Sequence, residues 1–375
     1  MKYYLIAGEA SGDLHASNLI KELKKKDVNA HFRCWGGDLM QAQGGELIKH
    51  YHDLAFMGFT EVLMNIRTIK KNIDFCKKDI LAYQPDVLIL IDYPGFNLRI
   101  AEFAHAKKIK TFYYISPQIW AWKQSRVHKI KRIVDKMFVI LPFEKKFYEK
   151  FNFEVEYVGH PLLDAISDRN EKKISSKEFS EKYHLSGKPI VALLPGSRKN
   201  EISKMLSLML ALVEQFNDYQ FVIAAAPSIP LAFYESSLRN TNVKIIYNQT
   251  YSLLQQSVAA VVTSGTATLE TALFGVPEVI CYKGSAISYL IARSLIKVKY
   301  ISLVNLIMDK PIVKELIQQD LTVENLKAEL EKLLFDSDYK TNMLNNFEEL
   351  KKLLGNSGAS EKTARLMIAN LTNQH

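Results

Sequence analysis

The chain is short of cysteine and has no long apolar stretch. Its three cysteines, Cys34, Cys76 and Cys281, are scattered through 375 residues. They predict neither a disulfide framework nor a zinc site, and they indicate a reducing compartment such as the cytoplasm. No apolar run reaches the roughly 20 residues that span a bilayer. The segment before Gly8 is too short for a signal peptide and predicts a first strand instead.

Motifs for metals and nucleic acids are also scarce. The one Asp-x-Asp triplet, residues 336–338, lies between late helical patterns and predicts a helix cap rather than a metal site. We therefore expect no metal and no cofactor. No nucleic-acid-binding module is recognisable, so no nucleic acid partner is expected. The net charge of +9 suits a nucleotide or an anionic membrane. Basic enzymes without such partners are common, however, and charge alone does not decide.

What the chain does contain is an alternation of short apolar runs with helical patterns. The runs in the first half are residues 3–7, 30–35, 87–91, 111–115, 137–140 and 155–158, and those in the second half are 189–194, 219–224, 243–246, 259–263 and 278–281. Such alternation predicts parallel sheets covered on both faces, with functional groups at the carboxyl ends of the strands. The fold class is therefore α/β, with two doubly wound Rossmann-like domains.

The domain boundaries follow from a polar linker. Residues 163–173 are rich in Asp, Asn, Glu and Lys, and Ser175 with Glu178 forms a capping box for the next helix. We predict a first domain over residues 1–165 and a second over residues 166–345. The helical segment 346–375 is expected to pack back on the first domain.

The second half contains two turns that suit an anion. Ser264, Gly265 and Thr266 join a strand to a helix, whose first backbone N–H groups carry partial positive charge. Thr266 and Thr268 add hydroxyl groups, and Glu270 lies one helical turn further, within reach of ribose hydroxyls. An ordinary Ser/Thr helix cap is the alternative explanation.

The other turn is Pro195-Gly196-Ser197-Arg198. Arg198 at the start of a helix is able to pair bidentately with a diphosphate, although it also fits an ordinary surface arginine. Further on, Asn305 is a polar residue flanked by apolar ones.

The first half offers groups that suit an acceptor. Asp92 follows a strand and precedes a Pro-Gly turn, which suits a general base or a turn-forming Asx residue. In the turn of residues 8–13 we expect Glu9 or Ser11 to face a sugar-sized ligand and Asp13 to cap the next helix; helix capping without a ligand is the alternative explanation.

Two tryptophans follow another strand. Gln118, Trp120 and Trp122 stand beside a proline turn, where the indoles are able to stack on a sugar or sit at a lipid headgroup interface. The cations behind them indicate either a solvated helix face or an anionic surface. His160 lies at the join of the two halves, as a sugar contact or a structural histidine.

The helix predicted over residues 60–83 is amphipathic. Its apolar stripe usually means a core-facing seam. Near its start the apolar face widens and cations surround it, which suits a membrane interface or acyl chains. We expect core packing from Ile73 onward and lipid contact in the first two turns, through Val62, Leu63, Ile66 and Ile69.

Five motifs stand in the order seen in one enzyme family. They are residues 8–13 (Gly-Glu-Ala-Ser-Gly-Asp), 116–122 (Ser-Pro-Gln-Ile-Trp-Ala-Trp), 141–144 (Leu-Pro-Phe-Glu), 194–198 (Leu-Pro-Gly-Ser-Arg) and 264–270 (Ser-Gly-Thr-Ala-Thr-Leu-Glu). With them the chain resembles, nearly end to end, the lipid-A-disaccharide synthases, which are GT-B glycosyltransferases of family 19.

The resemblance implies a GT-B fold with the two domains facing a cleft. It implies inverting transfer from UDP-2,3-diacylglucosamine to 2,3-diacylglucosamine 1-phosphate, which forms a β(1→6) disaccharide and releases UDP. Asp92 matches the family's base, Arg198 an essential arginine and Asn305 an essential asparagine near UDP. Gly95 stands where a second acid can occur, which leaves Asp92 as the carboxylate base of that turn. The implied location is cytoplasmic, peripherally at the inner membrane.

Other functions remain open at this stage. The nearest alternatives are another GT-B enzyme, such as a lipid-II-forming N-acetylglucosaminyltransferase, and a UDP-N-acetylglucosamine 2-epimerase. A non-catalytic carrier of lipid or nucleotide would use the same cleft without turnover. The oligomeric state is also open, with a homodimer as one option.

Overall fold

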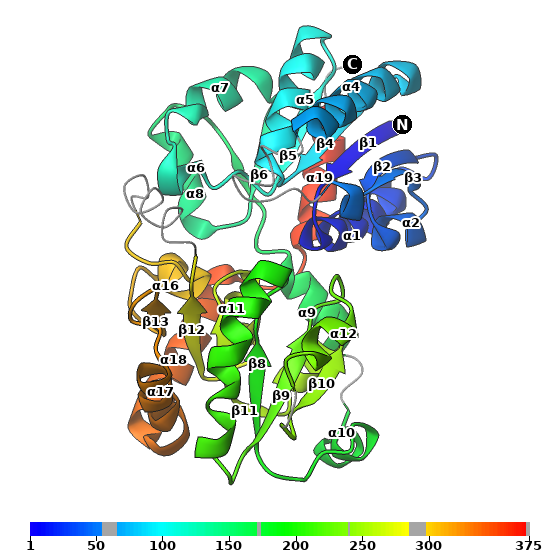
Figure 1. Ribbon diagram of the computed structural model, residues 1–375. Helices are drawn as coiled ribbons and strands as arrows, with labels where there is room; N and C mark the ends of the chain where they lie inside the picture. Colours follow the sequence, from blue (N-terminus) through cyan, green and yellow to red (C-terminus); the bar gives the residue numbers. More distant parts are fainter. Residues whose placement is uncertain (55–65, 171–173, 239–240, 285–297, 373–375) are drawn as a thin grey trace. The chain divides into compact units, whose positions relative to one another are not determined.

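The computed structural model of the protein describes residues 1–54, 66–170, 174–238, 241–284 and 298–372 (Figure 1). The chain divides into two compact units: unit 1 contains residues 1–168 and 354–375, and unit 2 contains residues 169–353. The boundaries predicted from the sequence lie after residues 165 and 345. Residues 346–353 belong to unit 2 because α18 (Ser337–Leu354) is one continuous helix in which Phe347 and Leu350 are buried.

Unit 1 is built on a parallel sheet of seven strands in the order β3-β2-β1-β4-β5-β6-β7. The strands are β1 (Lys2–Ala7), β2 (His31–Gly36), β3 (Glu46–His50), β4 (Val87–Ile91), β5 (Thr111–Tyr114), β6 (Lys136–Val139) and β7 (Glu156–Tyr157). β3 was not predicted from the sequence, because this edge strand is at most half-buried and has no continuous apolar run.

Alternate residues of β1 pack on opposite faces of this sheet, as the period of a strand requires. Tyr3, Leu5 and Ala7 share a core with α1 (Ala10–Lys26) and α19 (Ala359–Thr372). Tyr4 faces the other way, and its hydroxyl donates to Asp79 of α4 (Ile66–Tyr83) at 2.7 Å. The sheet is therefore covered on both faces (Figure 1).

The remaining described helices of unit 1 connect the strands, and one of them fixes the C-terminal return. They are α2 (Asp38–Ala42), α5 (Pro94–Ala106), α6 (Ile119–Trp122), α7 (Arg126–Ile133), α8 (Pro142–Glu149) and α9 (Leu162–Asn170). Asp164 of α9 accepts hydrogen bonds from the backbone N–H groups of Gly358 at 2.6 Å and Ser360 at 2.8 Å. This carboxylate caps the start of α19 and holds the C-terminal helix on unit 1.

Unit 2 contains a second parallel sheet, in the order β10-β9-β8-β11-β12-β13. Its strands are β8 (Ile190–Leu194), β9 (Gln220–Ala225), β10 (Lys244–Tyr247), β11 (Ser257–Thr263), β12 (Glu278–Tyr282) and β13 (Lys314–Ile317). Beside α18, its described helices include α10 (Ser176–Lys182), α11 (Lys199–Leu210), α12 (Leu231–Glu235), α13 (Thr250–Leu254), α14 (Thr266–Leu273), α16 (Leu303–Met308) and α17 (Val323–Phe335). β13 was not among the strands predicted from the sequence.

In each sheet there is one point at which the chain changes the side on which it adds successive strands. We call this point the reversal. In unit 1 the chain builds outward from β1 to β3 and then starts again on the other side of β1 with β4. In unit 2 the same reversal lies between β8 and β11. Ligands of doubly wound sheets bind at such reversals, outside the carboxyl ends of the strands. The strand order therefore marks one place in each unit where functional groups are expected.

Candidate active site

At the reversal in unit 1, two carboxylate residues follow adjacent strands. Ala7 and Ile91, the last residues of β1 and β4, lie opposite each other in the sheet. Glu9 comes two residues after β1, and Asp92 directly after β4. Burial raises the pKa of Asp92 to about 7, and the negative charges of Glu9 and Glu144 add to the rise. A carboxylate with a pKa near neutrality at the end of a strand is suited to take a proton from a substrate.

The turn of residues 8–13 holds Glu9 as the N-cap residue of α1, with Ser11 half-buried in the first helical turn. Gly8 is needed because a Cβ there would lie 2.3 Å from the ring of Tyr93. The prediction for Asp13 was wrong. This residue lies inside α1, and its buried carboxylate accepts from the N–H groups of Gly37 at 2.8 Å and Met40 at 3.1 Å. It caps α2 instead of α1.

The segment after β5 is organised by a carboxylate that the sequence analysis did not select. Glu144 is buried and accepts hydrogen bonds from the Ser116 hydroxyl at 2.5 Å and the Trp120 indole N–H at 3.2 Å. Its other oxygen accepts the backbone N–H of Leu141 at 2.9 Å, so that it closes a capping box at the start of α8. The Leu-Pro-Phe-Glu motif, with an acid at the third helical position, was the available signal.

Trp120 is consequently a structural residue and not a sugar-stacking platform. Its side chain is buried, with its ring 4.9 Å from Phe143 in an edge-to-face contact. Gln118 is exposed at the start of α6 and remains available to a ligand. Trp122 is 41% exposed, and the guanidinium of Arg126 lies over its ring at 4.5 Å.

His160 is also placed inside the unit. Its Nδ1 accepts from the backbone N–H of Leu162 at 3.3 Å, and the side chain is 2% exposed. Burial, with a smaller contribution from His15, lowers the pKa of His160 to about 3. The ring is therefore neutral and packed in the interior. The prediction of a sugar contact is not supported, because a buried imidazole presents no polar edge to a ligand.

At the reversal in unit 2 the two predicted anion turns follow neighbouring strands. Leu194 of β8 pairs with Val262 of β11. Gly196 follows β8 with a φ of +115°, and a Cβ there would crowd Glu201 at 2.9–3.0 Å. Arg198 is the exposed N-cap residue of α11, and its guanidinium nitrogen lies 2.8 Å from a Glu201 oxygen. The turn therefore presents a cation at the first turn of a twelve-residue helix.

In the turn after β11, some of the predicted ligand-binding residues are exposed and others are buried or bonded within the protein. Gly265 and Thr266 are exposed at the start of α14, as expected for a ligand-facing turn. Thr268 is buried, and its hydroxyl donates to the carbonyl of Gly265 at 2.9 Å, so the prediction that it faces an anion was wrong. The Ser264 hydroxyl donates to the carbonyl of Ile301 at 3.3 Å. Glu270 is half-buried and accepts from the Tyr251 hydroxyl at 2.7 Å.

The side chain of Asn305 is hydrogen-bonded to the segment that leads into β13. Its side-chain amide donates to the carbonyl of Val313 at 2.9 Å and to Glu315 at 3.0 Å. Its oxygen accepts the backbone N–H groups of Ile312 at 2.7 Å and Val313 at 3.0 Å. These four bonds use the two donors and two acceptor positions of the amide. A direct contact of Asn305 with UDP is therefore not supported, and its role is to shape the segment beside α14.

The apolar helix face is described only in part. Val62 and Leu63 lie outside the described residues, whereas Ile66 at the start of α4 is 58% exposed and Ile69 is half-buried. From Ile73 onward the stripe is buried, with Cys76 and Ile80 at 0% exposure, as expected. Within the described part of the chain, no helix combines the length and hydropathy needed to cross a bilayer.

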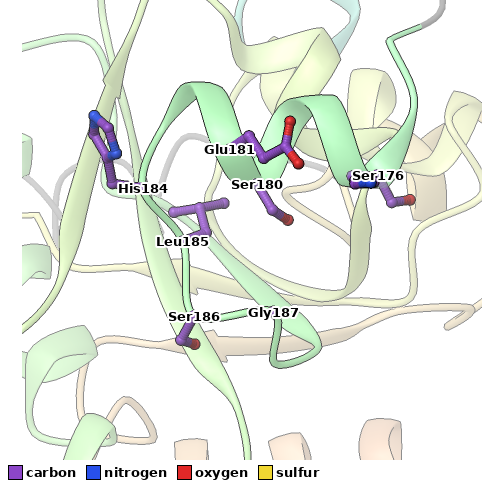
Figure 2. A pocket seen from close by; sticks show the side chains of 8 residues that line it. Ser176, Ser180, Glu181, His184, Leu185, Ser186 and Gly187 are labelled. Carbon is purple, nitrogen blue, oxygen red and sulfur yellow. The ribbon is translucent and has the colours of Figure 1, made fainter.

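In the described part of the chain, features away from the carboxyl ends of the strands do not add a second site. Figure 2 shows an open hollow lined by Ser176, Glu181 and His184, among others. It lies on α10 and the loop that leads into β8, at the opposite end of that strand from Gly196. Among the described residues, no group of three or more His, Cys, Asp or Glu side chains is placed to hold a metal ion. Asp336 instead accepts the N–H of Tyr339 at 2.9 Å, as the predicted helix cap.

Proteins related in sequence match this chain over nearly its whole length. A family model described as lipid-A-disaccharide synthetase matches residues 3–368. The lipid-A-disaccharide synthase of Syntrophus aciditrophicus (strain SB) is 39% identical over 371 residues, which cover 97% of this chain and 96% of that protein. The lipid-A-disaccharide synthase of Coxiella burnetii (strain Dugway 5J108-111) is 37% identical over 368 residues, with 97% and 96% covered.

Solved structures share the fold at low sequence identity. The UDP-GlcNAc 2-epimerase from Neisseria meningitidis bound to UDP-GlcNAc superimposes with a TM-score of 0.71 at 15% identity, covering 99% of this chain and all of that one. A glycosyltransferase of kitacinnamycin gives a TM-score of 0.64 at 13% identity, with 99% of each chain covered. These likenesses show the GT-B type of fold and no more. The sequence relationships show that the chain belongs to the lipid-A-disaccharide synthetase family and is a glycosyltransferase of lipid A biosynthesis.

Proposed function

We propose that this chain condenses UDP-2,3-diacylglucosamine with 2,3-diacylglucosamine 1-phosphate and releases UDP. The acceptor's 6-hydroxyl oxygen attacks the anomeric carbon of the donor as the bond from that carbon to the diphosphate breaks. The attack comes from the face opposite the departing diphosphate, so the α-linked donor yields a β(1→6) disaccharide 1-phosphate. The proton of the hydroxyl passes to the base, and the bonding electrons leave with UDP.

Asp92 is the proposed base. The observation that carries this assignment is its position at the reversal of the unit 1 sheet together with its pKa of about 7. A base with that pKa is largely deprotonated just above neutrality, and the turnover rate should rise as the pH increases through about 7. Glu9, Ser11 and Gln118 are the half-buried or exposed polar groups of unit 1 that we assign to the acceptor sugar.

Unit 2 is proposed to bind the donor. Arg198 and the N–H groups at the starts of α11 and α14 would stabilise the charge that develops on the departing diphosphate. Gly196, Ser197, Gly265 and Thr266 bring backbone close to it, with Ser264 beside them, and Glu270 is placed for the ribose hydroxyls. No metal is required in this scheme, because backbone dipoles and a guanidinium supply the positive charge.

The acyl chains need an apolar surface, and we assign the start of α4 to that role. Ile66 is exposed there, and Arg67 and Lys70 beside it are exposed cations. We therefore place the protein peripherally at the cytoplasmic face of the inner membrane. Apolar contact with acyl chains combined with cations near anionic headgroups is the usual chemistry of such surfaces.

The decisive assay supplies both proposed substrates in the presence of EDTA and identifies products by mass spectrometry. We expect a tetraacyl disaccharide 1-phosphate and an equal amount of UDP. UDP without disaccharide would indicate another acceptor, and a donor epimerised at C2 would indicate an epimerase. Asp92→Asn should reduce turnover to a small residual rate while UDP binding is little changed. A protein that binds the donor but never turns it over would be a carrier.

A further inference from the structure

The backbone at the proposed base is held in an unusual conformation. Asp92 and the next residue, Tyr93, have φ values of +45° and +48°. Two consecutive residues with side chains rarely occupy the left-handed region, because the Cβ crowds the backbone there. The conformation persists only when neighbouring groups hold it in place.

The carbonyl oxygen of Asp92 accepts hydrogen bonds from two buried side chains. The side-chain amide of Asn97 donates to it at 2.7 Å, and the hydroxyl of Tyr113 donates to it at 2.6 Å. Both donor side chains are 0% exposed. The nitrogen of Asn97 also lies 3.2 Å from the carbonyl oxygen of Ile91 and 3.4 Å from that of Ile6, at the ends of β4 and β1.

The other side of Asp92 is fixed as well. Its backbone N–H donates to the carbonyl of Tyr114 in β5 at 3.1 Å. The peptide groups before and after its Cα are thus both attached to the sheet, and the direction of the side chain follows from them. Both hydrogen bonds end on the carbonyl oxygen of Asp92 and not on its carboxylate.

We propose that Asn97 and Tyr113 are positioning residues for the reaction: they hold the carbonyl of Asp92 so that its carboxylate stays aimed at the acceptor hydroxyl. This inference rests on the proposed function, in which Asp92 is the base. Small errors in the placement of a reacting group cost large factors in rate, which is why a rigid support for the base matters. The charged groups that act on the carboxylate are Glu9 and Glu144, and neither is changed by a substitution of Asn97 or Tyr113.

The test compares Tyr113→Phe with Tyr114→Phe in the full-length protein. Both tyrosines are fully buried neighbours on β5, but their side chains lie on opposite faces of the sheet. We expect Tyr113→Phe to lower kcat about tenfold or more with KM changed less than about twofold. The pKa on the acid side of its pH–rate profile should also fall from about 7, because a released carboxylate reaches water. Tyr114→Phe should retain the wild-type kcat and profile.

Repeating Tyr113→Phe in an Asp92→Asn background separates this inference from the function on which it rests. If Asp92→Asn alone keeps the wild-type rate, Asp92 is not the base and the proposed function needs another one. If Asp92→Asn strongly lowers the rate but Tyr113→Phe has the wild-type kcat and pH profile, the positioning role is overturned.

A further loss of the small residual rate of Asp92→Asn when Tyr113→Phe is added would overturn it too, since the hydroxyl would then act independently of the carboxylate. Should Tyr113→Phe fail to fold, Asn97→Ser removes the other donor and is judged by the same measurements.

Discussion

The side-chain amide of Asn305 donates a hydrogen bond to the carboxylate of Glu315 at 3.0 Å, across the loop that joins α16 to β13. The same carboxylate accepts a hydrogen bond at 2.8 Å from the hydroxyl of Ser302, which is the N-cap residue of α16. Glu315 and Asn305 together fix the loop against the helix. Donor binding in unit 2 would then depend on Asn305 through the shape of this segment rather than through contact.

We therefore expect Asn305→Ala to lower the free energy of unfolding of the protein. The buried backbone N–H groups of Ile312 and Val313 would lose their acceptor, at a cost of about 2 kcal/mol or more in the free energy of unfolding. Urea unfolding of the variant measures this loss. Asn346→Ala is the control, because the Asn346 amide bonds within the exposed surface of α18. An unchanged unfolding midpoint in Asn305→Ala would contradict the structural role.

Arg198→Ala should leave the fold intact and slow turnover by about 100-fold or more. The guanidinium is about half-exposed, so its removal leaves no cavity, while the departing diphosphate loses a charge-assisted donor worth roughly 3 kcal/mol. Steady-state rates and the melting temperature measure the two effects. Arg132→Ala, which removes an exposed cation from α7, is the matched control and should be near wild type. Turnover by Arg198→Ala close to that of the control would remove Arg198 from the mechanism.

Two isoleucines of α4 should respond differently to the same substitution. Ile66→Asp is expected to weaken sedimentation with anionic lipid vesicles while the protein stays folded, because Ile66 is 58% exposed. Ile73→Asp should instead destabilise unit 1 by several kcal/mol, because Ile73 is only 8% exposed and a carboxylate would be buried there. Vesicle binding by Ile66→Asp equal to that of wild type would show that the start of α4 is not the lipid contact.

Acidification should destabilise unit 1 through His15 and His160. Burial lowers their pKa values to about 4 and about 3, with the His15 charge lowering that of His160 further and Asp164 opposing the shift at His15. Below the ordinary pKa of about 6.5 the unfolded chain takes up protons that the folded chain refuses. The stability contributed by the neutral rings is complete above pH 6.5, and it falls with decreasing pH down to about 3.

Thermal unfolding between pH 7.5 and 4 measures this dependence. His160→Gln should flatten the slope, although it is less stable at neutral pH, because one of the two titrating groups is gone. His105→Gln replaces an exposed histidine of α5 and should keep the wild-type slope. The assignment fails if all three proteins lose stability in parallel.

Much of the fold can be predicted from local sequence patterns. Buried strands such as β4, read as Val-Leu-Ile-Leu-Ile, are continuous apolar runs because helices cover both faces of the sheet. The edge strands β3 and β13 have mostly half-buried or exposed residues and lack that signal, and they were missed for this reason. The capping box of Ser175 and Glu178 was predicted and is present, because capping depends on residues only three apart.

The candidate site, like the fold, has features that the sequence predicts and features that it does not. Its residue types and motif order were sufficient to identify the family, and the turns at Asp92, Arg198 and Thr266 could be placed at strand ends from sequence alone. Which polar side chains face outward could not be inferred. Trp120, His160, Thr268 and Asn305 are all buried, each bonded to a partner whose position depends on how strands and helices pack.

By itself, therefore, the sequence determined the parallel α/β layers, the family and the turns that carry the chemistry, since these depend on composition and short-range spacing. Only the tertiary structure decided the strand order that sets Glu9 beside Asp92 and Arg198 near Thr266. It also decided the burial that moves the pKa of Asp92 to about 7. Both depend on contacts between residues far apart in the chain, and removal of a charged group from water becomes defined only once those contacts have formed.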